Sequence, residues 1–233
     1  MYFTYDEQAV AYLSRRDKRL GAVMERLGPV RREVIPDLFA ALVHAIVGQQ
    51  VSMTVQRTLW QRLCDRLREV SSSSVLAVAP EELRSLGLSG RKVEYVREAA
   101  QAVADGRLDV EALREMDDAA VCAALVGLRG VGVWTAEMLL LFSLQRQDVF
   151  SFDDLAIRRG LRMLYRHKDI DRERFERYRR RFSPYGSVAS LYLWAVAGGA
   201  LPELRDPSEP LRTSERKTAR RSGDDAAKKA RSA

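Results

Sequence analysis

The expected fold is decided by the stretch 125–136, which reads LVGLRGVGVWTA. Its two glycines, Gly130 and Gly132, separate two apolar runs, and glycine lets a backbone adopt positive φ and approach a ligand closely. Because the second run begins a helix at once, the unpaired N–H groups of its first turn point out of the loop and attract anions. We therefore expect two helices joined by a turn that grips a DNA phosphate without reading the bases. A plain connection between helices is the alternative.

Apolar residues recur at helical spacing on both sides of this turn, and no run alternates with the period of two that marks a strand. The sequence therefore predicts an all-α fold. We expect two helices within 36–68 that meet near 48–50, and further helices over about 80–87, 91–105, 117–126, 134–144, 154–165, 171–182 and 187–197. Ser89 is expected to cap the helix that follows it, and the serine run 71–74 is expected to be a linker.

The composition changes at about residue 206, and this change divides the chain into two expected parts. Residues 1–205 are predicted to form one helical domain of two lobes. Residues 206–233 are rich in Ser, Thr, Lys, Arg and Asp, so they cannot bury enough apolar surface to offset their chain entropy. We expect a disordered basic tail, which either adds non-specific affinity for DNA or has no role.

The charge of the chain points to a polyanionic partner. The 233 residues carry a formal net charge of +7. A basic balance favours DNA or RNA as the partner. An arginine-rich composition without such a partner is the alternative.

Metal ions and redox cofactors are not expected. The chain has two cysteines, Cys64 and Cys122, and two histidines, His44 and His167, all far apart in the sequence. A zinc site or an iron–sulfur cluster needs about four such ligands, so we expect reduced, structural thiols. The N-terminus is charged from the start and lacks an apolar core, so it is not expected to be a signal peptide. No apolar run is long enough to span a membrane, and these observations predict a cytoplasmic protein.

A pair of carboxylates follows the turn, in the stretch 148–157 that reads DVFSFDDLAI. Asp153 and Asp154 stand at the start of a predicted helix, where an acidic side chain caps free N–H groups and complements the helix dipole. Capping alone would explain both residues. Helical periodicity does not show which of the two faces the core.

Four segments together resemble the helix-hairpin-helix DNA glycosylase superfamily, and within it the 3-methyladenine DNA glycosylase II type. They are the turn with its following WTA, the DVFSFDDLAI stretch, the segment AIVGQQVS at 45–52 and the segment LGLSGRK at 86–92. The resemblance covers about residues 35–200. It implies a two-lobed helical bundle whose hairpin flanks a DNA-binding cleft, in a compact form without an N-terminal β-domain.

The resemblance also implies roles for single residues. Asp154 matches the catalytic aspartate, which leaves Asp153 mainly as a cap. The residues that match a pocket for the flipped base are Trp134 and Trp194, with ordinary helix packing as the alternative, and Tyr185 and Tyr192 as secondary candidates. The residues expected to contact DNA are Gly130, Gly132, Thr135, Gln50 and Ser89. Carbonyl groups of such a hairpin can also hold a monovalent cation.

The implied reaction is the excision of a base by hydrolysis, without a cofactor. Members that also nick the strand carry a lysine where Trp134 stands, and a tryptophan cannot form a Schiff base. We therefore expect a monofunctional DNA glycosylase of base-excision repair that flips out alkylated purines and leaves an abasic site. Bases such as 3-methyladenine and 7-methylguanine are cationic, so they leave without a general acid and suit a pocket of electron-rich rings.

The expected partner is double-stranded DNA with alkylated bases, bound by a monomer associated with the nucleoid. One departure concerns Gln50, which stands where some relatives place a bulky apolar wedge. The sequence therefore does not indicate how strongly the enzyme bends DNA. Three alternatives also stay open: a glycosylase for other damaged bases, a non-catalytic helix-hairpin-helix module that only binds DNA, and a helical protein–protein adaptor.

Overall fold

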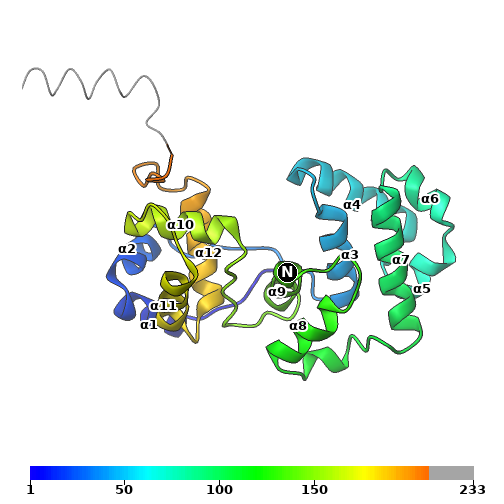
Figure 1. The fold of residues 1–233 in the computed structure, drawn as a ribbon, viewed down its shortest axis with the longest axis horizontal. Coiled ribbons are helices and arrows are strands. Elements are labelled where there is room, and N and C mark those ends of the chain that lie inside the picture. Colours follow the sequence, from blue (N-terminus) through cyan, green and yellow to red (C-terminus); the bar gives the residue numbers. More distant parts are fainter. Residues whose placement is uncertain (210–233) are drawn as a thin grey trace, which may run out of the picture.

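Helices provide nearly all the regular structure of residues 1–209, the part of the chain that the computed structural model describes (Figure 1). Within that part, the other regular features are a 3₁₀ turn at Ala112–Arg114 and a single antiparallel bridge between Tyr2 and Glu33. The prediction of an all-α fold is therefore confirmed. The helices are α1 Glu7–Arg16, α2 Lys18–Leu27, α3 Leu38–Gly48, α4 Met53–Leu67, α5 Ser72–Ala77, α6 Pro80–Ser85, α7 Gly90–Ala104, α8 Asp118–Val126, α9 Val133–Phe142, α10 Leu155–Tyr165, α11 Arg172–Phe182 and α12 Gly186–Ala197.

The helices form two lobes, as predicted. Figure 1 shows α1 and α2 grouped with α10, α11 and α12 in one lobe, and α3 to α8 in the other. The α9 helix lies between the lobes and packs against α3 and α8. The N-terminal helices thus complete a lobe that is otherwise built from the C-terminal part of the domain.

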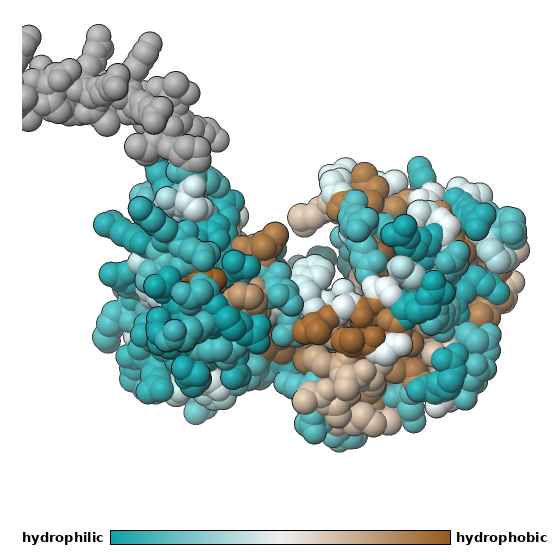
Figure 2. Space-filling view, in the orientation of Figure 1, coloured by the Kyte–Doolittle hydropathy of each residue, from teal (hydrophilic) through white to brown (hydrophobic). Residues whose placement is uncertain are grey.

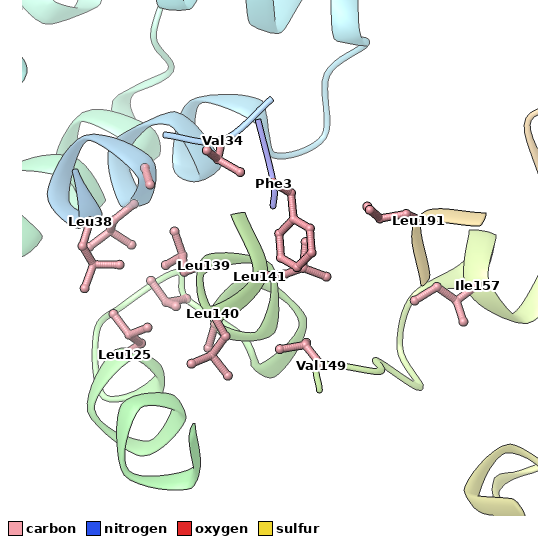
Figure 3. Close-up of a cluster of buried hydrophobic side chains, with 14 of the residues drawn as sticks. Phe3, Val34, Leu38, Leu125, Leu139, Leu140, Leu141, Val149, Ile157 and Leu191 are labelled. Carbon is pink, nitrogen blue, oxygen red and sulfur yellow. The ribbon is translucent and has the colours of Figure 1, made fainter. Parts of the chain in front are cut away.

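A single core runs through both lobes because α9 is apolar on nearly every side. Figure 3 shows Leu139, Leu140 and Leu141 of α9 pointing into side chains from both neighbouring regions. The buried partners labelled around them are Phe3, Val34, Leu38, Leu125, Val149, Ile157 and Leu191. The helix that follows the glycine turn is therefore held rigidly between the lobes.

Most helix starts are capped by the short polar side chains that favour this position. The caps that accept a backbone N–H are Asp6, Asp17, Asp37, Ser52, Ser71, Ser89, Asp117, Asp154 and Asp171. Three helices, α6, α9 and α12, begin without a side-chain cap. The α9 start is the one at the glycine turn.

Two parts of the chain differ from the sequence-based expectations. The prediction that the serine run 71–74 is a linker is wrong, because Ser71 caps α5 and the Ser71 N–H donates a hydrogen bond to the Ser74 hydroxyl oxygen. Serine competes for backbone groups at a helix start, so a serine run can begin a helix as readily as it can separate two. Helices α1 and α2 were not predicted at all.

The predicted boundary at residue 206 also lies too early. Asp206 is buried and accepts two hydrogen bonds from the guanidinium of Arg162 on α10, while Glu209 pairs with Arg159. The folded part therefore continues to at least residue 209. The rest of the predicted tail, 210–233, lies outside the described residues. Within residues 1–209, no helix combines the length and apolarity that crossing a bilayer requires.

Candidate active site

The Asp154 side chain lies at the start of α10 and is nearly inaccessible to solvent. Its Oδ1 accepts the Ile157 N–H at 2.8 Å and so caps the helix. Asp154 is 6% exposed, whereas Asp153 lies on the surface. The prediction that Asp153 is the main cap is wrong, because the Asp154 carboxylate is the one that lies over the free N–H groups of the first turn.

Two indole rings hold the same carboxylate. Trp134 Nε1 donates to Asp154 Oδ2 at 3.0 Å, and Trp194 Nε1 donates to Asp154 Oδ1 at 3.0 Å. These donors come from α9 and α12, so three helices meet at one side chain. All three hydrogen-bond donors are neutral, and they therefore orient the carboxylate without cancelling its charge.

The two tryptophans differ in their exposure. Trp194 is partly buried, and its ring stacks on Phe142 with the centroids 5.5 Å apart. Trp134 is 44% exposed, and Leu155, the residue after Asp154, is also exposed. Figure 2 shows a recess between the two lobes. A ring that is bonded at its nitrogen and exposed on its face can receive a planar ligand by stacking.

Close packing of α10 on α12 fixes the distance between Asp154 and Trp194. Gly160 of α10 faces the backbone of Leu193, and a Cβ at residue 160 would lie 2.4 Å from the Leu193 carbonyl oxygen. Only glycine lets the two helices approach this closely. The same approach carries Trp194, the next residue of α12, to Asp154.

The two tyrosine candidates lie elsewhere. Tyr185 precedes the first turn of α12 and packs edge-on against Tyr12 of α1, whereas Trp194 lies in the last turns of that helix. Tyr192 is 1% exposed, and its hydroxyl donates to the Gly28 carbonyl. The structure therefore brings Trp134, Trp194 and Asp154 together, and it does not bring Tyr185 or Tyr192 to them.

The glycine turn has part of the backbone that the sequence predicted, because Gly130 adopts positive φ whereas Gly132, with φ −94°, does not. Gly130 has φ +80°, and a Cβ there would lie 2.2 Å from the Tyr95 ring, so this position admits only glycine. Gly132 is the N-cap residue of α9, with no side-chain cap and with open space where a Cβ would be. The first N–H groups of α9 thus face a gap that an anion can enter.

The loop between α3 and α4 supports this turn through Gln49. The Gln49 side chain donates to the Gly130 carbonyl at 2.7 Å. Gln50 is exposed and has φ +56°, in the left-handed region. Its contact with DNA stays a prediction, as does a monovalent cation on the hairpin carbonyls, one of which already accepts the Gln49 hydrogen bond.

Ser89 and Thr135 were the remaining predicted DNA contacts. Ser89 caps α7, as predicted, by accepting the Lys92 N–H at 3.4 Å. Lys92 also ties α7 to α3, because its Nζ donates to the Val47 carbonyl at 2.7 Å, and partial burial lowers the pKa of this amine. Thr135 lies in the first turn of α9 and is 6% exposed, and its contact with DNA stays a prediction.

Sequence reasoning missed a second carboxylate near the site. Glu137 lies one turn after Trp134 on α9 and accepts a hydrogen bond from the buried Ser151 hydroxyl. Burial raises the pKa of Glu137, and the nearby charges of Asp153 and Asp154 raise it further. The sequence contained a signal for this residue. Glu137 follows Trp134 by three positions, and residues at this spacing share one face of a helix.

A comparison with protein families identifies this arrangement. Residues 43–184, which include the turn and Asp154, match the HhH-GPD superfamily of base excision DNA repair proteins. The chain belongs to this family. It is a DNA glycosylase of base excision repair.

Individual relatives agree with this assignment. The DNA-3-methyladenine glycosylase 1 of Schizosaccharomyces pombe is 28% identical over 84% of this chain and 86% of its own length. A putative DNA-3-methyladenine glycosylase of Bacillus subtilis is 28% identical over 67% of this chain, which spans only 58% of that relative.

Solved structures show the same fold. A DNA-3-methyladenine glycosidase from Bacillus halodurans superposes with a TM-score of 0.77 at 34% identity, covering 90% of this chain and 98% of that one. The Schizosaccharomyces pombe 3-methyladenine DNA glycosylase in complex with abasic DNA superposes with a TM-score of 0.71 at 25% identity, covering 82% and 97%. The likeness therefore extends across both lobes.

Proposed function

We propose that this glycosylase releases alkylated, cationic purines from duplex DNA by hydrolysis, with Asp154 as the catalytic carboxylate, and leaves an abasic site. The observation that carries the proposal is the buried carboxylate held by two indole N–H groups at the start of α10. The names of the relatives above, which are 3-methyladenine glycosylases, support the substrate class.

Asp154 is suited to the charge that develops in this reaction. Cleavage of an N-glycosidic bond builds positive charge on the sugar, and a fixed carboxylate stabilises that charge. Opposite charges about 4 Å apart attract by roughly 4 kcal/mol at an effective dielectric constant of 20. This energy corresponds to nearly three powers of ten in rate. The same carboxylate is placed to orient, or take a proton from, the attacking water.

Trp134 supplies the surface for the base. A base inside the duplex is out of reach, so it is flipped into the recess before the bond breaks. The exposed face of Trp134 stacks on the flipped base, and a cationic purine gains about 0.5–2 kcal/mol from each such ring. A cationic base also leaves without a proton donor, so one carboxylate is enough.

The lysines of the described residues support a monofunctional reaction. Residues 1–209 contain Lys18, Lys92 and Lys168. The amine of Lys92 is engaged with the Val47 carbonyl, and the other two lysines lie at the start of α2 and after α10. A strand-nicking glycosylase needs an amine at the sugar, and the position beside Asp154 is taken by the Trp134 indole.

The test is a base-release assay on a duplex with one 7-methylguanine. Wild type, Asp154→Asn and Asp153→Asn are compared, and abasic sites are counted with and without alkali. We expect strand breaks to need alkali, Asp154→Asn to be inactive and Asp153→Asn to match wild type. Strand breaks without alkali would overturn the monofunctional reaction, and an active Asp154→Asn would overturn the catalytic role.

A negative result on this substrate is also informative. If wild type binds DNA and releases an oxidised or deaminated base in place of 7-methylguanine, the substrate class is wrong and the role of Asp154 is retested on that lesion. If it binds DNA and releases no base from any of these substrates, the proposed reaction fails.

A further inference from the structure

An open depression lies on the lobe that contains α1 and α11, and arginines line it. Arg16 ends α1, and Arg177, Arg180 and Arg181 lie on α11, around a volume of about 340 Å³. Figure 2 shows a broad hydrophilic surface over this lobe. We call these four residues the arginine surface.

Within residues 1–209, two of the four guanidinium groups have a carboxylate partner, and two have none. Arg181 is oriented by the buried Asp17 carboxylate, at 2.8 Å, and lies over the Tyr178 ring. Arg177 pairs with the exposed Glu173 at 2.6 Å. Among the described residues, Arg16 and Arg180 make no ion pair or hydrogen bond. Two cations of the arginine surface are therefore free to bind an external anion.

The positive charge of the folded part is concentrated at this place. Residues 1–209 contain 31 basic and 29 acidic side chains. The segments 15–19 and 172–181 alone contain ten basic and three acidic ones. The remaining described residues are therefore net acidic, with 21 basic and 26 acidic side chains, and the arginine surface lies in a strongly basic region of its lobe.

This surface is separate from the active site. The α11 helix leads directly into the first turn of α12, whereas Trp194 lies eight residues beyond Gly186. At 1.5 Å per residue, that separation is about 12 Å along α12. Figure 1 shows α12 between α11 and the central helix α9, and α1 farther from α9 than α12 is. DNA in the cleft does not account for the arginines here.

We propose that the arginine surface binds the phosphates of a second DNA segment while the cleft holds the first. Guanidinium groups match phosphate oxygens with paired hydrogen bonds. The groups are spread over two helices around an open depression, which suits an extended polyanion better than a single enclosed ion. No aromatic face is exposed among the four lining residues for a base to stack on, so the contact is to the backbone. This inference does not depend on the lesion class or on Asp154.

The test measures bridging of two duplexes by the full chain. One lesion-free duplex is attached to beads, and a second, fluorescent duplex is captured only if one protein particle holds both. The variant Arg16→Ala/Arg180→Ala removes the two unpaired cations without breaking an ion pair. The control Arg32→Ala/Arg68→Ala removes the same charge at two exposed arginines, one in the loop before α3 and one at the C-terminal end of α4.

We expect the Arg16→Ala/Arg180→Ala variant to capture at least tenfold less of the fluorescent duplex, and the control variant to match wild type. The slope of log capture against log salt should fall by about two, because each lost phosphate contact contributes about 0.9. Base release from a short, saturating duplex should be unchanged. Equal bridging by this variant and wild type would overturn the proposal. So would an equal loss in the control, or displacement of the duplex by inorganic phosphate at constant ionic strength.

Discussion

The starts of α9 and α10 are joined by the hydrogen bond from Trp134 to Asp154, and they treat their free N–H groups in opposite ways. The start of α10 carries its own anion, because the Asp154 carboxylate caps it and is buried there. The start of α9 carries none, because Gly132 has no side chain and the space in front of it is open. Both positions attract negative charge, so the difference lies in which molecule supplies it.

This difference separates catalysis from binding within one site. A carboxylate that belongs to the protein is present before the substrate arrives and is oriented by two indole groups, so it can stabilise positive charge on the sugar. A vacant helix start instead binds an anion that the substrate brings, such as a backbone phosphate. Trp134 lies in the first turn of α9 and contacts Asp154, so it joins the two arrangements.

The largest effect is expected from removing the charge at α10 while keeping its cap. Asp154→Asn should lower the rate of base release by about 10³-fold, because the charge that stabilises the sugar is lost. Its stability should fall by about 1 kcal/mol, because Asn keeps the cap to the Ile157 N–H but its amide nitrogen replaces the oxygen that accepts the Trp134 N–H. Urea unfolding and single-turnover kinetics measure the two quantities.

Asp154→Ala is the matched comparison. It loses both the charge and the cap, so it should be equally inactive and about 1 kcal/mol less stable than Asp154→Asn. If Asp154→Asn loses activity only in proportion to its stability, the carboxylate is a structural cap and the contrast with α9 disappears.

The next effect concerns the turn that presents α9. Gly130→Ala should destabilise the protein by roughly 2–3 kcal/mol, because Gly130 has φ +80° and the new methyl group would meet the Tyr95 ring. Gly132→Ala, two residues on, enters open space at an ordinary φ and should change stability by less than about 0.5 kcal/mol. Thermal unfolding of both variants checks this, and equal effects would contradict it.

A smaller effect is expected when α9 is made to resemble α10. Gly132→Asp places a carboxylate at the vacant N-cap, so the helix should gain a few tenths of a kcal/mol. DNA affinity should fall about tenfold, because the new charge occupies and repels the phosphate position. Gly132→Asn is the control, since it caps without charge and should bind DNA more tightly than Gly132→Asp at every salt concentration. Equal DNA affinities of the two variants would contradict the binding of a phosphate at the start of α9.

The smallest effect is expected from Glu137. Its pKa is raised in the folded protein, so its contribution to stability is present below its ordinary pKa of 4.5 and is lost as pH rises through the folded value. In Glu137→Gln, the amide oxygen can still accept the Ser151 hydrogen bond, and the side chain no longer ionises. The loss of stability with rising pH is therefore removed. The stability of the variant relative to wild type should therefore rise as the pH increases from 4.5 to 7.

Glu115→Gln is the control for this pH dependence, because Glu115 lies on the surface. Its stability difference from wild type should not vary with pH over the same interval. If the stability difference between Glu137→Gln and wild type also does not vary with pH, the pKa of Glu137 is not raised in the folded protein.

Most helix positions could be predicted because their signals are local. Ser89, Asp117 and Asp171 each cap a helix that the sequence placed within a residue or two. The serine run was misread, since the same side chain that breaks a helix in one place caps it in another. The helices α1 and α2 were missed although both begin after an aspartate cap, Asp6 and Asp17.

The catalytic candidate could be selected only by resemblance, because two adjacent aspartates have nearly the same local environment in the sequence. Their environments in the folded protein differ, because Asp154 is hydrogen-bonded to Trp134 and Trp194 and Asp153 lies on the surface. Tyr185 was a plausible pocket residue by its neighbourhood in the chain, yet it lies before the first turn of α12, nine residues before Trp194.

The sequence by itself determined the helical class, the glycine turn and the vacant start of α9, because each depends on residues that are neighbours in the chain. Only the tertiary structure decided which aspartate is buried, that Glu137 lies beside it, and that the arginines of α1 and α11 form one surface. Those features join residues from about 15 to more than 160 positions apart, and their contacts exist only after the helices pack. Local patterns determine where a helix begins, and packing determines what its first turn faces.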